Sequence, residues 1–304
     1  MKINNEFLLS EKYIDFMKHN VSVELLEGTT FAGKTTVGAV KFLLKVAKSE
    51  KKLHILSGLD KGTIEKNIII PDYGVLDVFG IYEDGGILEY NPNGKVAHAM
   101  AHLILHTKKD TKIIYVLGYD DKTRWKKALG GQYGCLYIDE INIADMDYVR
   151  EATMRYDYLL ATLNPDDPSL PIYEEYINHS RPIEKYKNEA PRSIQRDMNL
   201  SKPVGDWTHW FFTFKDNISA TEEKIKQIKA SVPKGTKIYK NQILGERGRA
   251  QGLVFPNFNE IRNVISESIL KEKMRENNLS FVKFTMGVDT AYSTQSEDTI
   301  AFIF

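Results

Sequence analysis

Two spacings of apolar residues alternate along this chain. Short, nearly continuous apolar runs are typical of buried strands, and apolar residues at every third or fourth position are typical of helices. The runs predict strands at residues 23–27, 52–57, 112–117, 135–140, 158–162 and 207–214. The helical spacing predicts helices at residues 9–18, 36–48, 59–70, 145–155, 221–230 and 237–245. Strands that alternate with helices predict a largely parallel sheet with helices on both of its faces.

Two regions depart from this alternation. Residues 74–106 are expected to be strand-rich, with a turn at residues 91–94, where Asn-Pro-Asn-Gly supplies turn-forming residues. Residues 252–258 break the pattern and are expected to form a linker. Strand-like runs follow at residues 281–288 and 298–304, and the sequence stops within the second run.

Residues 28–35 read Gly-Thr-Thr-Phe-Ala-Gly-Lys-Thr and match the phosphate-binding P-loop pattern G-x-x-x-x-G-K-[ST]. The match lies between a predicted strand and a predicted helix. The glycines let the backbone wrap phosphates, and the helix N-terminus turns its free N–H groups and positive dipole end toward them. We therefore expect a nucleoside triphosphate to bind here. The expected contacts are Gly28, Thr29, Thr30, Phe31, Ala32, Gly33, Lys34, Thr35 and Thr36.

A pair of acidic residues, Asp139 and Glu140, ends the predicted strand at residues 135–140. Asp139 can hold Mg²⁺ beside Thr35, and Glu140 can orient and polarise the water that attacks the γ-phosphate. The alternative is an Asp-Glu pair that the dipole favours at a helix N-terminus. Together with a P-loop in which Lys34 stabilises the phosphates, the pair predicts ATP hydrolysis rather than phosphorylation of a small molecule.

Polar residues end the next predicted strand along the chain. Thr162 and Asn164 are expected near the γ-phosphate, where they could report hydrolysis to the rest of the protein. A simple Asn-Pro turn after a strand explains the same residues equally well.

Charge that develops on the γ-phosphate usually requires an arginine or a second lysine. Arg124 and Lys127, just before the strand that ends in Asp139, are the first candidates. The alternative is a solvated helix face. Arg247 and Arg249 form a second candidate pair.

Composition narrows the class of protein without identifying it. With 304 residues, of which 42% are hydrophobic and 27% charged, the chain suits one large globular domain or two smaller ones. A formal net charge of zero gives no global basic field for nucleic acid, although a local basic face would suffice. The single cysteine, Cys135, excludes a disulfide framework. Without a membrane-length apolar stretch or a signal-peptide pattern, a cytoplasmic enzyme is expected.

The P-loop, the Asp139-Glu140 pair, and Thr162 with Asn164 occur in an order that resembles the large terminase subunit of tailed bacteriophages. That subunit is the motor that packages double-stranded DNA into preformed capsids. Three further stretches are similar to the family's finger segment, its lid region and its entry into the nuclease domain. They are residues 126–131, residues 212–217 with 244–246, and residues 252–258. The resemblance covers essentially the whole chain.

The resemblance implies an α/β fold of the RecA/ASCE-like P-loop NTPase class, with a mostly parallel sheet flanked by helices, followed by the start of an RNase H-like nuclease domain. It places an ATPase domain at residues 1–250, with a core at about 1–200 and a lid subdomain at about 201–250. A linker at residues 251–280 and the first nuclease strands at residues 281–304 would follow.

Residues 286–291 resemble the first strand of that nuclease, in which Asp289 would ligate the catalytic metals. Two divalent cations, Mg²⁺ or Mn²⁺, must flank a scissile phosphate in such a site. One aspartate cannot hold two metals, and the remaining nuclease strands are absent after Phe304. We therefore expect a truncated or proteolysed form without a competent nuclease site.

One position departs from the family's pattern. Family members often carry a glutamine upstream of the P-loop that reads adenine, and residues 9–13 offer Tyr13 instead. We expect Tyr13 to hold the base by stacking.

Cofactors and partners follow from the resemblance. It implies ATP and Mg²⁺, and as partners double-stranded DNA, the portal protein and the small terminase subunit. It also implies a homo-oligomeric ring, monomeric when isolated, that docks transiently on the procapsid portal in the host bacterial cytoplasm. Two other functions stay open: a DNA or RNA helicase, which would need a second RecA-like domain, and a nucleotide-gated assembly factor with little turnover.

Three other groups of residues favour structural roles. His98, His102 and His106 share one face of a helix or strand, but no acidic or cysteine partner is adjacent in sequence, which disfavours a metal site. The aromatic run from Trp207 to Phe212 favours core packing over stacking on bases, because duplex DNA exposes none. Cys135 is expected to be a buried small hydrophobe.

Overall fold

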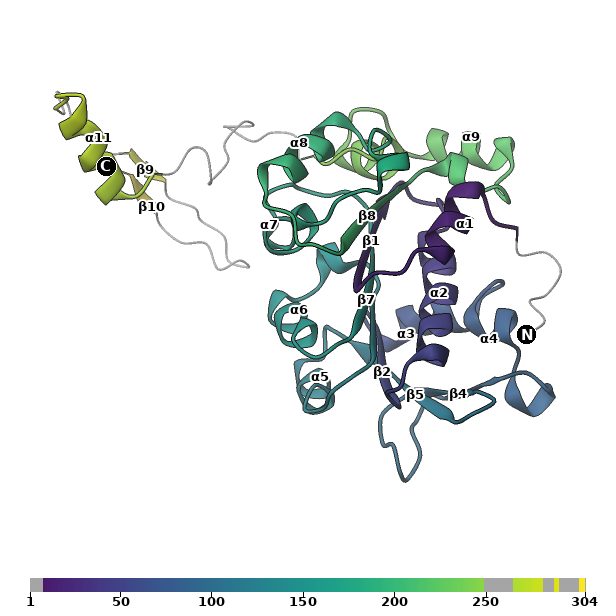
Figure 1. Ribbon diagram of the computed structural model, residues 1–304. Coiled ribbons are helices and arrows are strands. Elements are labelled where there is room, and N and C mark those ends of the chain that lie inside the picture. Colours follow the sequence, from purple (N-terminus) through teal and green to yellow (C-terminus); the bar gives the residue numbers. More distant parts are fainter. Residues whose placement is uncertain (1–7, 249–264, 281–286, 290–300, 304) are drawn as a thin grey trace. The chain divides into compact units, whose positions relative to one another are not determined.

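The computed structural model of this chain describes residues 8–248, 265–280, 287–289 and 301–303 (Figure 1). The chain divides into two compact units, Met1–Val254 and Phe255–Phe304. The large sheet and the candidate site lie in the first unit. The described elements of the second unit are α11 (Glu267–Glu276) and an antiparallel pair, β9 (Gly287–Asp289) and β10 (Ala301–Ile303).

An eight-stranded sheet forms the centre of the first unit, in the order β3-β4-β5-β2-β6-β7-β1-β8. The six parallel strands are β5 (Thr111–Gly118), β2 (Leu53–Gly58), β6 (Cys135–Ile138), β7 (Tyr158–Leu163), β1 (Val23–Gly28) and β8 (Trp207–Phe212). Two antiparallel strands, β4 (His102–His106) and β3 (Leu88–Asn91), extend the sheet beyond β5. The mostly parallel α/β sheet predicted from the apolar runs is confirmed.

Helices cover both faces of this sheet, as Figure 1 shows. On one face lie α1 (Glu11–Lys18), α2 (Lys34–Lys48) and α4 (Val75–Phe79). On the other lie α5 (Lys122–Ala128), α6 (Met146–Thr153) and α7 (Pro171–Glu175). The other helices of this unit are α3 (Lys61–Ile64), α8 (Arg192–Leu200) and α9 (Glu222–Ser231). Single turns are η1 (Glu65–Ile69), η2 (Tyr82–Asp84), η3 (Ile141–Ile143), η4 (Ile177–His179), η5 (Glu184–Tyr186), η6 (Phe214–Asp216) and η7 (Tyr239–Ile243).

Two of the expected elements differ from the structure. Residues 74–106 hold the expected turn and two strands, but they begin with the helix α4, so the strand-rich prediction is only partly right. Val75, Val78 and Phe79 have helical spacing and are all buried, which explains the helix. The predicted helix at residues 237–245 is shorter, over residues 237–243, and it ends in the π-helical turn η7.

Side chains alternate between two hydrophobic cores, one on each face of the sheet. In β6, Cys135 and Tyr137 belong to the core under α2, whereas Leu136 and Ile138 belong to the core under α5 and α6. Trp210 and Phe212 of β8 are buried in the first core, so the aromatic run packs inside as predicted. Burial raises the pKa of the Cys135 thiol to about 12.

The three spaced histidines lie on β4 and just before it, each with its own neighbour. His98 Nδ1 is 2.9 Å from the Tyr115 hydroxyl, and His102 Nδ1 is 2.8 Å from the Met100 carbonyl. The His106 ring stacks on Tyr82 with 3.7 Å between ring centroids. Within the described ranges, no three or more histidine, cysteine or acidic side chains are grouped to hold a metal ion. Those ranges also contain no helix with the length and apolar character needed to cross a membrane.

A buried ion pair joins the strand that enters the P-loop to the helix that leaves it. Lys41 of α2 pairs with Glu24 of β1, and the two residues are 1% and 0% exposed. The Glu24 carboxylate also accepts hydrogen bonds from the Tyr158 hydroxyl at 2.7 Å and the Trp210 indole at 3.1 Å. Burial lowers the pKa of Lys41 to about 8. The pair therefore keeps β1 and α2 in one arrangement.

We expect the substitution Lys41→Met to destabilise the first unit by about 3–5 kcal/mol, because it leaves a buried carboxylate without its counter-charge. Lys48→Met, at an exposed position near the end of the same helix, is the matched control. Urea unfolding followed by circular dichroism measures both free energies. Equal midpoints for the two variants would contradict a stabilising role for the pair.

Candidate functional site

The P-loop connects β1 to α2 and begins with a very close approach between two strands. A Cβ atom on Gly28 would lie 1.8 Å from the carbonyl oxygen of Phe212 in β8. The same carbonyl accepts the N–H of Thr29 at 3.0 Å. Gly33, the residue before α2, has φ of 90°, a left-handed conformation that glycine adopts readily. Both motif glycines therefore meet a backbone requirement that a side chain would violate.

Lys34 is held inside the curve of the loop. Its ammonium donates to the carbonyls of Gly28 at 3.1 Å and Thr29 at 2.7 Å. A third hydrogen bond, of 3.0 Å, reaches Oδ1 of Asn164. Burial lowers the pKa of Lys34 to about 8, although the nearby carboxylates of Asp139, Glu140 and Glu27 oppose the shift. This positive group is thus centred among the loop and the predicted acids.

Asp139 lies directly against the start of α2, because β6 ends at the edge where the loop begins. Its Oδ1 accepts hydrogen bonds from the hydroxyls of Thr162 at 2.6 Å, Thr35 at 3.1 Å and Tyr137 at 3.3 Å. Burial raises the pKa of Asp139, and these hydroxyl hydrogen bonds oppose the rise. The structure thus brings Asp139 to the P-loop residue beside which the sequence placed it.

Glu140 follows in a left-handed backbone conformation with φ of 51°, which is uncommon for a residue with a side chain. Its N–H donates to the Thr162 hydroxyl at 3.2 Å. Burial and the neighbouring Asp139 raise the pKa of Glu140, while Lys34 lowers it. A half-buried carboxylate with a raised pKa is a stronger proton acceptor than an ordinary surface glutamate.

The end of β7 contacts the Asp139 carboxylate, the Lys34 ammonium and the backbone of Glu140. Thr162 bonds both acidic residues, and Asn164 bonds Lys34. Asn164 therefore does more than begin a turn, which was the alternative interpretation of the Asn-Pro pair.

Two tyrosines that sequence patterns did not identify complete the site. The hydroxyl of Tyr137 lies 3.3 Å from both the Thr35 carbonyl and Asp139 Oδ1. The Tyr119 hydroxyl lies 3.4 Å from the carbonyls of Asp139 and Glu140. Tyr137 is an ordinary position of the predicted strand at residues 135–140, and Tyr119 follows the predicted strand at residues 112–117, so no local signal marked either residue.

The expectation that Tyr13 stacks on a base is not supported by its position. Tyr13 is 2% exposed, and its ring stacks on Phe212 with 4.2 Å between centroids. Its hydroxyl donates to the Ala32 carbonyl at 2.8 Å. Tyr13 therefore lies beneath the P-loop and supports it, because its ring fits the apolar core better than solvent.

Arg124 and Lys127 are exposed on α5 and do not reach the loop of their own chain. The Arg124 guanidinium pairs with Asp121 at 3.1 Å, and its side chain is 67% exposed. Within the part of the chain that the structure describes, neither residue forms a hydrogen bond or ion pair with residues 28–35. A role for either residue in the site therefore stays a prediction.

The second candidate pair is also placed differently from the expectation. Arg247 is 3% exposed and forms two hydrogen bonds with Glu27, of 2.9 and 2.8 Å, instead of facing a phosphate position. Arg249 lies outside the described residues. A charged residue inside a buried strand needs a partner of opposite charge, so Glu27 in the predicted strand was the sequence signal for the Glu27–Arg247 ion pair.

The residues present suit a Mg²⁺-bound nucleoside triphosphate. The Thr35 hydroxyl and the Asp139 carboxylate are oxygen donors side by side, as a hard cation prefers, and Mg²⁺ usually takes one or two carboxylates plus substrate phosphates. The free N–H groups at the start of α2 and the Lys34 ammonium suit phosphate oxygens.

The aspartate expected in a nuclease site lies in the second unit. Asp289 is the last residue of β9, and its backbone pairs with Ala301 of β10. Asp298, Thr299 and the expected linker at residues 252–258 lie outside the described residues. A nuclease role for Asp289 stays a prediction.

No protein-family model matches this chain, and no curated protein does either. Among solved structures, it is similar to the large terminase of the thermophilic bacteriophage D6E, with a TM-score of 0.61 and 17% identity over 95% of this chain and 63% of that one. The same terminase in complex with ADP gives a TM-score of 0.59 and 19% identity over 94% and 62% of the two chains. The large terminase ATPase domain of Thermus phage P74-26 gives a TM-score of 0.53 and 11% identity over 77% and 95%.

These likenesses show that the chain has a large-terminase-like fold with the sheet of a P-loop NTPase. The chain spans less than two thirds of the D6E terminase. At such identities the shared fold is the finding, and the chemistry depends on the residues above.

We expect Gly28→Ala to destabilise the first unit by about 3 kcal/mol or more, because the added methyl group would force β8 away from β1. Gly205→Ala, where an added Cβ meets no atom within 4 Å, is the matched control and should change stability by less than about 0.5 kcal/mol. Thermal unfolding measures both. A Gly28→Ala protein as stable as its control would refute the close approach.

Proposed function

We propose that this chain is the ATP-hydrolysing part of a phage large terminase, the motor that moves double-stranded DNA into a procapsid. The observation that carries the proposal is the meeting of Lys34, Thr35 and Asp139, with Glu140 next in the chain, at one edge of a parallel sheet. The terminase-like fold, and the ADP in one similar structure, support it.

Each part of the site then has a role in binding. The loop wraps the phosphates and holds them through the N–H groups of residues 31–36, because the N–H groups of Thr29 and Thr30 donate to the carbonyls of Phe212 and Gln242. Lys34 moves from the loop carbonyls to the phosphates. Thr35 and Asp139 hold Mg²⁺, which neutralises phosphate charge when bound. Tyr137 and Thr162 keep the Asp139 carboxylate aimed at Thr35.

Glu140 orients the attacking water and accepts its proton. The left-handed backbone at Glu140 and the hydrogen bond from its N–H to Thr162 fix the backbone position from which the Glu140 side chain extends. Its raised pKa, caused first by burial, matches a general base better than an ordinary glutamate would.

Thr162 and Asn164 couple hydrolysis to the rest of the protein. Lys34 donates a hydrogen bond to Asn164 as well as to the loop carbonyls. When Lys34 moves to the phosphates, Asn164 loses this hydrogen bond and is free to move. Thr162 responds to both acidic residues. The end of β7 is therefore the element that distinguishes the states before and after hydrolysis.

The proposed setting is that of a terminase motor. Its partners are double-stranded DNA, the portal protein and the small terminase subunit, and it works as a ring in the host bacterial cytoplasm, docked on the procapsid portal. In the ring, Arg124 or Lys127 of one copy reaches the phosphates of the next. Asp289 is proposed as one metal ligand of an RNase H-like nuclease.

A time course of phosphate release, with and without duplex DNA, tests the motor directly. We expect slow hydrolysis by the isolated chain and acceleration by duplex DNA. A parallel strand-displacement assay on a tailed duplex should show no unwinding, since unwinding would indicate a helicase. Nucleotide binding without turnover under either condition would instead indicate an assembly factor.

We expect Glu140→Gln to lower steady-state hydrolysis by at least about a hundredfold, because it removes the general base. Binding of a fluorescent ATP analogue should persist, since the phosphate contacts remain. Glu223→Gln, at an exposed position on α9, is the control and should match the unchanged chain. Undiminished turnover in Glu140→Gln would exclude the proposed role.

Loss of Arg124 should affect assembled copies only. We expect Arg124→Ala to lower DNA-stimulated hydrolysis by about a thousandfold or more, the effect of removing an arginine finger, while nucleotide still binds. Lys122→Ala, exposed on the same helix, is the control.

Mixing experiments distinguish a finger that acts between copies. A mixture of Arg124→Ala and Glu140→Gln proteins should regain hydrolysis, because the first supplies an intact base and the second an intact finger. A mixture as inactive as its components would rule out a finger supplied between copies.

A further inference from the structure

The residue that precedes the P-loop carries a buried charge with an elaborate set of partners. Glu27 is 0% exposed, and both of its carboxylate oxygens accept hydrogen bonds from the Arg247 guanidinium, at 2.9 Å from Nε and 2.8 Å from Nη2. His209 Nε2 lies 2.9 Å from the same carboxylate. Burial raises the pKa of Glu27, but Arg247 and then His209 outweigh it, so the pKa falls to about 2.

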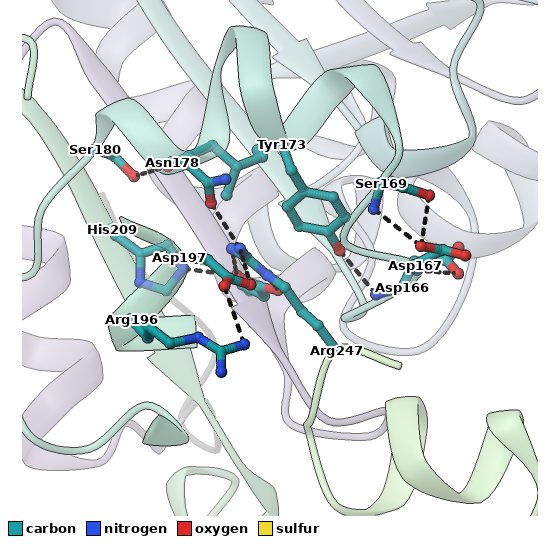
Figure 2. Close-up of polar contacts among 12 residues, drawn as sticks. Asp166, Asp167, Ser169, Tyr173, Asn178, Ser180, Arg196, Asp197, His209 and Arg247 are labelled. Carbon is teal, nitrogen blue, oxygen red and sulfur yellow. Dashed lines mark hydrogen bonds and ion pairs between the residues drawn. The ribbon is translucent and has the colours of Figure 1, made fainter. Parts of the chain in front are cut away.

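Arg247 is held on its other sides as well. Figure 2 shows it beside the ring of Tyr173, close to Asn178 and Asp197. Its guanidinium carbon lies 4.0 Å from the Tyr173 ring centroid, and Nη1 donates to Asn178 Oδ1 at 2.6 Å. The Asp197 carboxylate lies 3.8 Å away. These contacts hold the guanidinium in one orientation, in which it donates both hydrogen bonds to Glu27.

Arg247 belongs to a segment that contacts the P-loop at several points. We call residues 237–248 the lid segment. The carbonyl of Gln242 accepts the Thr30 N–H at 2.9 Å. A Cβ atom on Gly245 would lie 3.2 Å from Cγ2 of Thr29. The lid segment thus touches the loop directly, besides the residue before it.

The same segment is tied to the strand end that holds Lys34. Asp166, two positions after Asn164, pairs with Lys237 at 2.6 Å. Its carbonyl accepts the Gly248 N–H at 3.2 Å, and its own N–H donates to the Tyr173 hydroxyl at 2.8 Å. Tyr173 therefore contacts Arg247 with its ring and Asp166 with its hydroxyl. It thus connects the attachment of the lid segment at Glu27 with its attachment at Asp166.

A buried ion pair is a poor means of adding stability alone, because apolar residues of similar volume often stabilise a fold equally well or better. The bidentate geometry of the Arg247–Glu27 pair does fix the backbone of each residue in one position relative to the other. At one end that backbone is the start of the phosphate-binding loop.

We propose that Arg247 is a positioning residue of the nucleotide site: through Glu27 it fixes the start of the P-loop, so that nucleotide binds tightly only when the lid segment is docked. The inference rests on the proposed function, since it assigns an additional determinant to the same nucleotide site. The Arg247 guanidinium is bonded to Glu27 and Asn178, so Arg247 acts on the site through Glu27.

A set of variants separates positioning from simple stabilisation. Arg247→Met leaves Glu27 charged and unpaired, and should lower the urea midpoint. The double variant Glu27→Gln with Arg247→Met removes both charges, and should regain most of that stability. Arg247→Lys keeps the charge but loses the planar fork. Arg196→Met, an exposed arginine beside Asp197 in Figure 2 with a side chain 64% exposed, is the matched control.

Urea unfolding, affinity for a fluorescent ATP analogue, and kcat and KM for ATP are measured on each full-length variant. We expect the double variant and Arg247→Lys to bind the analogue more weakly by about tenfold to a hundredfold, as misplaced binding groups do, with KM raised similarly. The Arg196→Met control should bind like the unchanged chain.

A double variant or an Arg247→Lys protein that is folded and has unchanged affinity and KM would overturn the inference and leave the proposed function intact. If the double variant does not fold, Arg247→Lys decides by the same criteria. An unchanged chain that neither binds nor hydrolyses ATP would refute both the proposed function and the inference.

Discussion

One carboxylate oxygen connects the parts of this site. Oδ1 of Asp139 accepts hydroxyl hydrogen bonds from Thr35, Tyr137 and Thr162, which come from α2, β6 and β7. The contact exists because β6, β7 and β1 are neighbouring parallel strands whose carboxyl ends meet at one edge of the sheet. A buried carboxylate without such donors would be costly, so its position and the strand order depend on each other.

The strand that enters the P-loop is held by a buried charge on each of its faces. Glu24 pairs with Lys41 on the face covered by α2, and Glu27 pairs with Arg247 on the face where Tyr173 packs. Residues three apart in a strand point to opposite faces, which is why one short strand serves both pairs. The loop therefore begins at a strand that is fixed by an ion pair on each face.

Where the sequence prediction was wrong, the local pattern was compatible with two different structures. The apolar residues of 75–79 suit a strand or a short helix, and packing against α2 selected the helix. Tyr13 could have lain against a base or in a core, and Phe212 from β8 provided the core. Arg247 looked as suitable for a phosphate contact as Arg124 in sequence, yet Arg247 is buried on Glu27, whereas Arg124 is exposed and its role stays a prediction.

The sequence by itself determined most of the elements and pointed to the P-loop and the acidic pair, because both depend on neighbours within short windows. Helical and strand periodicity, the P-loop spacing and the acidic pair at a strand end are all of this kind. Only the tertiary structure decided which residues meet. The hydrogen bond from Tyr137 to Thr35 spans 102 positions, and that from Arg247 to Glu27 spans 220. Such contacts arise from strand order and burial, and no local pattern encodes them.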